Sequence, residues 1–577
     1  MNKILKYILP AAALLLSAGM TSCLNDLHVT PIDPTMQTTV DAENLFNKCY
    51  ANFGLAGNGG PDGDSDVDGI DGGTSGLYRQ MWQSNELTTD EAFCGWGDEG
   101  VGTYCYNTYD ASHPMLRGYY YRLCVGIAYC NQYLKDFSEH DATMTAEVRF
   151  LRAFQYYLLM DAYGNIPFAT TISSEKPQQA TPAEVQKFIE DECLAILGEN
   201  AEDNAYVLAD AQPHKKGDGR WGRVDKAAAW MLLSRLYLNS EAHTGVAQWE
   251  KAKDYAEKVI NSSYQLSEVP SSHEVTMKDP SSDAQMTETW EFSPYQMLFM
   301  GDNSRTSAAD EAIFPILSEG TRTASWGVSL FLIASTHDGD MHDLRYDEFY
   351  ADQSKRSVNG VSGQAWGGNR ARPELIKLFF KNIDDCPTET ASYDMPVAAE
   401  DDRAIFNTIG RKLNIEDPSA FKNGYAVAKF TNFTTDGSKT SDATHPDMCV
   451  MLMRKAEAYL NAAEAEMHLN GANSDKAKGW IDALRDRAHA EKRSTYSLED
   501  VLDERARELY CEGLRRTDLI RYNQFGGAQA TYNWEYKGGN EKGTTFDKKF
   551  NVYPLPSSEL LSNKNLTQID GYNEVQN

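Results

Sequence analysis

The chain has 577 residues, and 84 Asp and Glu against 54 Lys and Arg give it a formal charge of −30. The length allows a large buried core, and the acidic excess excludes a nucleic-acid-binding protein, because phosphate neutralisation needs a basic surface. Hydrophobic residues make up 41% of the chain and aromatic residues 11%, which excludes an intrinsically disordered protein.

The first residues have the pattern of an export signal. Lys3 and Lys6 precede an apolar run over residues 8–16, which is too short to span a bilayer, since a span needs about 20 apolar residues. Small residues follow and lead to Cys23, as in the lipidation site of bacterial lipoproteins. We therefore expect residues 1–22 to be a lipoprotein signal peptide and Cys23 to carry acyl chains that anchor the protein to a membrane. The alternative is an ordinary cleaved signal with an incidental cysteine.

Apolar residues recur with the 3.6-residue period of a helix in several segments. Residues 147–163 are apolar almost all round and are followed by Gly164, a typical helix stop. Thr181 to Glu184 form a capping box with proline at the first helical position, which predicts a helix to about Leu197. Further helices are expected over residues 225–238, 249–260, 451–469 and 475–490, and from Ser497 onwards.

These helices form pairs whose length is typical of tetratricopeptide-like repeats. Residues 265–445 differ, because Gly, Ser, Asp and Thr are plentiful there and helical patterns are few. We therefore predict a mostly α-helical fold, in which tetratricopeptide-like helix pairs form a scaffold and long loops with short strands carry the ligand site. Trp230, Trp249 and Trp480 fall within the predicted helices and are expected in the core, whereas the pattern does not assign Trp82, Trp290 and Trp534.

An acidic stretch, residues 62–71, begins like a calcium-binding loop, with Asp64, Asp66 and Asp68 at alternate positions. The twelfth position of such a loop is Ser75 instead of the usual bidentate glutamate. A solvated acidic turn is the favoured interpretation, and a calcium ion held by these three aspartates is the weaker alternative. We expect no other metal or cofactor.

The sequence gives no support for an enzyme, because the HExxH, GxSxG and Walker motifs are absent. Acidic residues on the C-terminal helices are explained as solvated faces or as partners of Arg454, Arg505 and Arg507. These acidic residues are Glu457, Glu464, Glu466, Glu504 and Glu508. We therefore expect a binding protein without catalytic activity.

Six separated segments resemble signature segments of the SusD/RagB family. They are residues 23–34, 147–168, 222–240, 454–466, 504–522 and 553–572. Members of this family are lipid-anchored, surface-exposed outer-membrane proteins that cap a SusC-like TonB-dependent transporter. They hand it glycans or, in the RagB branch, peptides, and do no chemistry. The resemblance implies the same location and partners here.

The resemblance also implies a division of the chain. Residues 23–264 would form an N-terminal helical region. Residues 265–577 would hold a loop-rich ligand-binding insertion at 265–445, followed by the C-terminal helices. Both regions are expected in one compact body.

Three tryptophans lie in glycine-rich loops without helical register, namely Trp96, Trp326 and Trp366. Aromatic rings on rigid loops suit the C–H faces of sugars, and polar side chains beside them suit the hydroxyls. The resemblance implies that these three rings form an arc that stacks on a starch chain and that Arg79 hydrogen-bonds to sugar. We therefore expect the protein to capture oligosaccharides, with starch or malto-oligosaccharides as the first candidates, for a SusC-like transporter.

One departure from the starch-binding pattern follows Trp96 directly, where Asp98-Glu99 stands in place of amide-bearing residues. Another glycan, a peptide ligand of the RagB kind and a structural lid without a ligand therefore remain as alternatives. A single loop tryptophan can also cap the core, since tryptophan is highly buried on average.

Overall fold

The structure is a computed structural model that describes residues 40–61, 65–278, 284–341 and 358–572. Contacts divide the chain into a short unit, residues 1–45, and a large unit, residues 46–577, which carries the features described below. The predicted signal peptide (residues 1–22), Cys23 and Asp64 lie outside the described residues.

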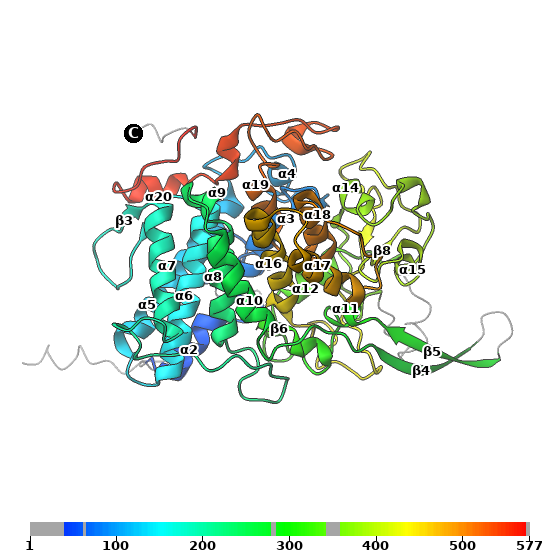
Figure 1. Ribbon diagram of the computed structural model, residues 1–577, viewed down its shortest axis with the longest axis horizontal. Coiled ribbons are helices and arrows are strands. Elements are labelled where there is room, and N and C mark those ends of the chain that lie inside the picture. Colours follow the sequence, from blue (N-terminus) through cyan, green and yellow to red (C-terminus); the bar gives the residue numbers. More distant parts are fainter. Residues whose placement is uncertain (1–39, 62–64, 279–283, 342–357, 573–577) are drawn as a thin grey trace, which may run out of the picture. The chain divides into compact units, whose positions relative to one another are not determined.

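Helices dominate two parts of the described chain, one before residue 261 and one after residue 454 (Figure 1). The first group is α2 (Ala42–Ala51), α3 (Leu77–Glu86), α4 (Val101–Cys105), α5 (Pro114–Asp136), α6 (Ala142–Tyr163), α7 (Pro182–Ile196), α8 (Lys226–Leu238), α9 (Ser240–Thr244) and α10 (Trp249–Ile260). The C-terminal group is α16 (Lys455–Asn470), α17 (Asp475–Arg487), α18 (Leu498–Leu509), α19 (Arg515–Arg521) and α20 (Ser557–Ser562). The described helices between the two groups are all short, namely α11 (Pro294–Met297), α12 (Ser329–Ser335), α14 (Pro373–Lys377) and α15 (Met395–Ala399). Within the described ranges, none of these helices is both long and apolar enough to cross a membrane.

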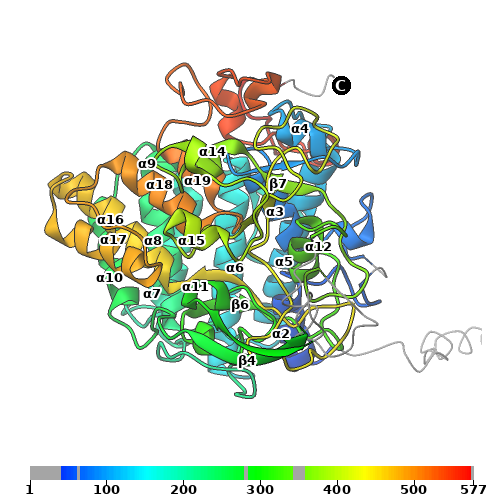
Figure 2. The same cartoon turned by 90° about the vertical axis from the view of Figure 1, so that its right-hand side faces the viewer.

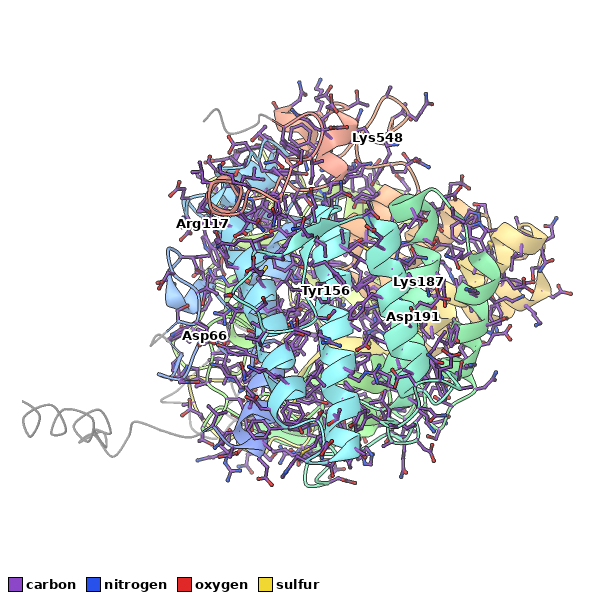
Figure 3. The ribbon with its side chains drawn as sticks, turned by 90° about the vertical axis from the view of Figure 1, so that its left-hand side faces the viewer. Asp66, Arg117, Tyr156, Lys187, Asp191 and Lys548 are labelled. Atoms are coloured by element: carbon purple, nitrogen blue, oxygen red, sulfur yellow. The ribbon has the colours of Figure 1, made fainter. Side chains whose placement is uncertain are left out.

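Neighbouring helices pack in a continuous series. Helix α5 packs on α6 and α6 on α7, while α8 packs on α10, α10 on α16 and α16 on α17. Figure 3 shows the cyan and green helices of this series side by side. Buried alanines on α8 and α16 leave room for close approach of the backbones, and on the exposed side of α7 Lys187 pairs with Asp191 at 2.8 Å. The predicted mostly helical fold is confirmed.

Local capping interactions set the ends of the predicted helices. The Glu184 carboxylate accepts a hydrogen bond from the Thr181 backbone N–H at 2.8 Å, and the reciprocal bond completes the capping box of α7. The same box between Ser497 and Asp500 opens α18. Gly164, with φ of 66°, ends α6. These predicted helix ends are confirmed.

Within the described ranges the strands pair two by two, and the strand β4 of one of these pairs lies along the lower side of Figure 2. The pairs are β1 (Ala92–Cys94) with β7 (Asn369–Ala371), β2 (Ile166–Phe168) with β3 (Gln178–Ala180), β4 (Ser271–Lys278) with β5 (Gln285–Phe292), β6 (Ala312–Ile316) with β10 (Val450–Arg454), and β8 (Phe406–Asn407) with β9 (Ala426–Val427). The predicted helix start at Met451 is therefore wrong. Residues 451–454 are strand because the apolar run pairs with the distant, fully buried β6, and α16 begins at Lys455.

The tryptophans expected in the core are placed differently. Trp230, Trp249 and Trp480 lie in helices as predicted, but each is only half-buried. Trp249, for example, stacks on His468 with ring centroids 4.0 Å apart, which gives this half-buried helix position its own aromatic partner. The unassigned Trp82 and Trp534 are fully buried, and Trp290 is buried as well.

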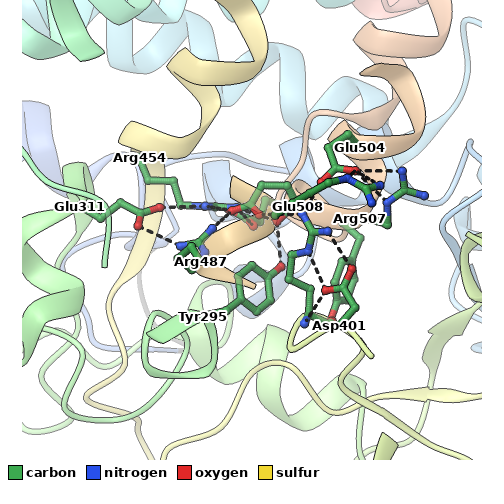
Figure 4. Close-up of polar contacts among 12 residues, drawn as sticks. Tyr295, Glu311, Asp401, Arg454, Arg487, Glu504, Arg507 and Glu508 are labelled. Carbon is green, nitrogen blue, oxygen red and sulfur yellow. Dashed lines mark hydrogen bonds and ion pairs between the residues drawn. The ribbon is translucent and has the colours of Figure 1, made fainter. Parts of the chain in front are cut away.

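A buried network of ion pairs joins the C-terminal helices to the loop-rich region (Figure 4). At its centre the Glu508 carboxylate pairs with Arg454 at 2.6 Å, with Arg403 at 3.2 Å and with Arg487. These arginines come from the end of β10, from the loop after α15 and from α17. Glu504, one turn earlier on α18, pairs with Arg403 at 2.8 Å. Further members are Glu311, Asp401, Arg485 and Arg507.

The structure corrects one expectation about the five acidic residues of the C-terminal helices, two of which, Glu504 and Glu508, belong to this network. Their predicted pairing with basic residues is confirmed. The prediction that they lie on solvated faces is wrong, because all five carboxylates are buried between packed elements. The remaining three pairs are Glu457 with Arg235, Glu464 with Arg521, and Glu466 with Lys253. Arg505 pairs with Asp518 instead of one of the five.

We predict that the protein loses stability in acid through Glu508. Burial alone would raise the pKa of Glu508, but Arg487, Arg454 and Arg403 outweigh burial and hold this pKa at about 2. An unfolded glutamate titrates near pH 4.3, so the stabilisation is complete above that pH and is lost as the pH falls toward 2. The loss is on the order of 3 kcal/mol from this residue, at about 1.4 kcal/mol per pKa unit.

Urea unfolding between pH 2.5 and 7 checks this prediction. Glu508→Gln should be less stable at pH 7 by about 3–5 kcal/mol, because it leaves buried guanidinium groups unpaired, and its free energy of unfolding should vary less with pH. Parallel pH profiles for the two proteins would contradict the role given to Glu508.

Candidate functional site

The structure brings Trp96, Trp326 and Trp366 together. The ring centroids of Trp96 and Trp366 are 6.2 Å apart with planes inclined at 52°, and those of Trp366 and Trp326 are 6.1 Å apart with planes inclined at 45°. All three rings are half-buried, in contrast to the fully buried Trp82. We call these three residues the tryptophan arc. Because the planes of neighbouring rings are inclined at 52° and 45°, the arc does not form one flat surface.

Strand pairing positions Trp96. The antiparallel ladder aligns Cys94 of β1 with Asn369 of β7, and one residue further the Gly95 N–H donates to the Gly368 carbonyl at 3.2 Å. The Trp96 Nε1–H then donates to the Gly367 carbonyl at 3.2 Å. Its ring lies on Gly368, where a Cβ would come within 2.2 Å of the ring atom Cε2. The ring therefore depends on the absence of a side chain at this glycine.

Helix α12 supports the other two rings. The Trp366 N–H donates to the Ala334 carbonyl at 2.7 Å, which attaches its loop to the C-terminal end of α12. Trp326 lies three residues before the helix and follows Ser325, whose hydroxyl donates to the Gly54 carbonyl at 2.7 Å. Every residue of α12 is buried. The buried helix α12 thus holds the Trp366 loop by a hydrogen bond and directly follows the Trp326 loop, which Ser325 attaches to the turn after α2.

Arg79 lies beside the arc on α3. Its guanidinium carbon is 5.7 Å from the Trp96 ring centroid and 4.8 Å from that of Phe331 on α12. The side chain is 7% exposed, and its Nε is buried without a hydrogen-bond partner. Within the part of the chain that the structure describes, we find neither an ion pair nor a hydrogen bond for this guanidinium. Burial lowers the pKa of Arg79 to about 10, although the Asp98 carboxylate opposes that shift.

A buried guanidinium nitrogen without an acceptor is unfavourable in the free protein, because the Arg79 Nε has given up water without gaining a hydrogen bond, and the contacts with the two aromatic rings do not supply one. A ligand oxygen beside Trp96 would provide an acceptor for it. Arg79 therefore has the features of a ligand-binding donor, and its role remains a prediction. Asp98 and Glu99 are exposed and form an acidic rim next to Trp96.

Two further residues of the site carried no signal in the sequence. The His445 ring centroid lies 5.3 Å from that of Trp326, and Phe331 contacts both Trp96 and Arg79. His445 is far from Trp326 in the sequence, and Phe331 falls in a short apolar run. Only the folded chain shows that they adjoin the arc.

The aspartates considered for calcium are placed as follows. The Asp66 carboxylate pairs with Lys48 at 2.8 Å and with Arg122 at 3.3 Å, and Asp68 is exposed. A calcium ion at Asp66 would have to displace both cations, so the arrangement does not favour one. Across the described ranges, no cluster of three or more His, Cys, Asp or Glu side chains is placed to hold a metal ion.

Comparisons with known proteins support the predicted resemblance. The sequence profile of the SusD family matches residues 410–572. The starch-binding protein SusD of Bacteroides thetaiotaomicron is 32% identical over 608 aligned residues, which cover 99% of this chain and 100% of that protein.

Solved structures share the fold. Surface glycan-binding protein A from Bacteroides uniformis superposes with a TM-score of 0.62 at 19% identity, covering 91% of this chain and 98% of that one. Surface glycan-binding protein A from Bacteroides thetaiotaomicron, in complex with laminarihexaose, superposes with a TM-score of 0.60 at 17% identity, with the same coverage of 91% and 98%.

We predict that Gly368→Ala displaces the Trp96 ring, because the added Cβ would overlap it. The near-ultraviolet circular dichroism should change, and the free energy of unfolding should fall by about 1–3 kcal/mol, as is typical of overpacking. Gly97→Ala is the matched control, since a Cβ there meets no atom within 4 Å. A Gly368→Ala variant with native spectrum and stability would disprove this packing.

Proposed function

Because the chain belongs to the SusD family, we propose that it is a cell-surface protein that captures oligosaccharides on the tryptophan arc. The observation that carries this proposal is the adjacency of three half-exposed rings whose planes are mutually inclined at 52° and 45°. Rings stack on the C–H faces of sugars, and each ring contributes on the order of 1–3 kcal/mol, by analogy with the stacking of bases on aromatic side chains.

The ligand we propose first is starch or a malto-oligosaccharide. An α-linked glucan is a curved chain, whereas a β-1,4-linked glucan is a flat ribbon, and inclined rings suit the curved one. The starch binding of the 32% identical relative supports the same choice. Arg79 would donate hydrogen bonds to sugar hydroxyls and fix the register of the chain. A different glycan is the second candidate, since the acidic rim of Asp98 and Glu99 departs from the starch-binding pattern.

We further propose that the protein is anchored at Cys23 to the outer membrane and delivers its ligand to a SusC-like TonB-dependent transporter. The signal pattern over residues 1–22 and the family membership support this location. We propose binding without catalysis. The five acidic residues of the C-terminal helices support this, because each carboxylate is already paired with a basic side chain. A peptide ligand of the RagB kind would leave the arc unexplained.

The central test is the loss of binding in ring variants. Trp96→Ala and Trp366→Ala should each weaken oligosaccharide binding by tenfold or more while the protein stays folded. Affinity electrophoresis of residues 24–577 in gels containing amylopectin, xyloglucan, inulin or galactomannan measures this and reports the glycan. Trp249→Ala, outside the arc and also half-buried, is the control and should migrate as the wild type does. Unchanged retardation of both arc variants would refute the site.

Arg79→Met separates a ligand-binding role from a structural one. Methionine is apolar and similar in length, so it removes an unpartnered buried charge. We expect the free energy of unfolding to stay the same or rise by about 1 kcal/mol, while affinity for the retained glycan falls at least tenfold. Calorimetric titration and urea unfolding measure the two effects. A variant that loses stability but keeps its affinity would show that Arg79 is structural.

A further inference from the structure

A cavity lies next to the arc. It has a volume of about 420 Å³ and is lined by α2 with the turn after it, by the loop before α8, by β6, and by the loop that leads into α12. His445 is shared between the two features, because it lines the cavity and its ring contacts Trp326. Ser325, the residue before Trp326, lines it too.

The walls of this cavity are mainly aromatic and aliphatic. Tyr50, Phe53 and Phe314 form one wall, in which the Phe314 ring meets the other two edge to face with centroids 6.2 and 5.5 Å away. Ile316 and Val328 continue it. Such a surface stabilises an apolar ligand and offers little to a sugar, whose hydroxyls need hydrogen-bond partners.

Most polar side chains of the lining are already satisfied within the protein. The Tyr50 hydroxyl donates to Glu147 at 2.6 Å, Arg223 pairs with the same carboxylate at 2.8 Å, and the Ser325 hydroxyl donates to a backbone carbonyl. Among the buried side-chain polar atoms of the lining, His445 Nε2 is the one that has no hydrogen-bond partner in the described part of the chain. The cavity therefore combines mainly apolar walls with one buried, unpartnered polar atom on the side of the arc.

We propose that this cavity binds an aromatic acid carried as an ester on the captured glycan, a proposal that rests on the glycan-binding function above. The ring would lie among Tyr50, Phe53 and Phe314, and His445 would hydrogen-bond to an oxygen of the ester or of a ring substituent. The volume is sufficient, because an engineered cavity of about 150 Å³ already holds benzene. The protein would then select glycans by their decoration as well as by their chain.

The test uses methyl ferulate alone, so that it does not depend on the glycan. Isothermal titration of residues 24–577 should show one binding site. Two variants place a larger side chain at a lining position, each on a different element: Ala51→Phe at the end of α2 and Leu317→Trp after β6. Each should weaken methyl ferulate binding at least tenfold and leave the affinity for maltoheptaose within twofold. Val246→Phe places the same ring at an exposed position and should change neither.

The arc variants separate this proposal from the proposed function. Trp96→Ala should weaken maltoheptaose binding by tenfold or more and leave methyl ferulate binding within twofold. A wild-type protein that binds methyl ferulate but not maltoheptaose would refute the starch ligand and keep the cavity proposal. Absence of methyl ferulate binding by the folded wild type would overturn the cavity proposal, as would binding that both filled variants retain.

Discussion

The ion pairs around Glu508 are the interaction on which the rest of the architecture depends. Arginines from a strand, a loop and a helix meet at this one carboxylate, so the loop-rich region is tied to the helical series at a fully buried point. A buried charge is tolerated only while its partners stay in place. The network therefore fixes the position of the loop-rich region, which has few helices of its own, relative to the C-terminal helices.

The tryptophan arc is likewise held in place by buried elements beneath its loops. Helix α12 is short, but it is enclosed on all sides and provides hydrogen-bond acceptors at its C-terminal end for the Trp366 loop. The β1–β7 ladder adds Trp96 from a third segment. Loops with rigid supports can present half-buried rings without collapsing onto the core. This arrangement holds the Arg79 guanidinium over the Trp96 and Phe331 rings while its Nε stays without a hydrogen-bond acceptor in the described residues, a cost that the surrounding packing offsets.

How far the sequence predicts this structure depends on the range of the interactions. Helix ends such as those at Thr181 and Gly164 were predictable because a cap is made within one turn. The sequence pattern of residues 451–454 predicts helix wrongly, because only their pairing with β6, over 130 residues away, makes them strand. The loop setting of the three tryptophans was readable from their glycine-rich context, whereas the contact of His445 with Trp326 had no local signal. The burial of the helix carboxylates had no local signal either, because folding alone brings their basic partners next to them.

The arc draws each of its rings from a different stretch of chain, around residues 96, 326 and 366. Each ring can therefore be exchanged by changes in one loop, while α12 and the β1–β7 ladder keep the others in place. Such a surface can evolve one position at a time, and each intermediate keeps two rings in their original geometry. A scaffold of this kind lets the recognised shape change one ring at a time while the fold and the positions of the other two rings stay the same.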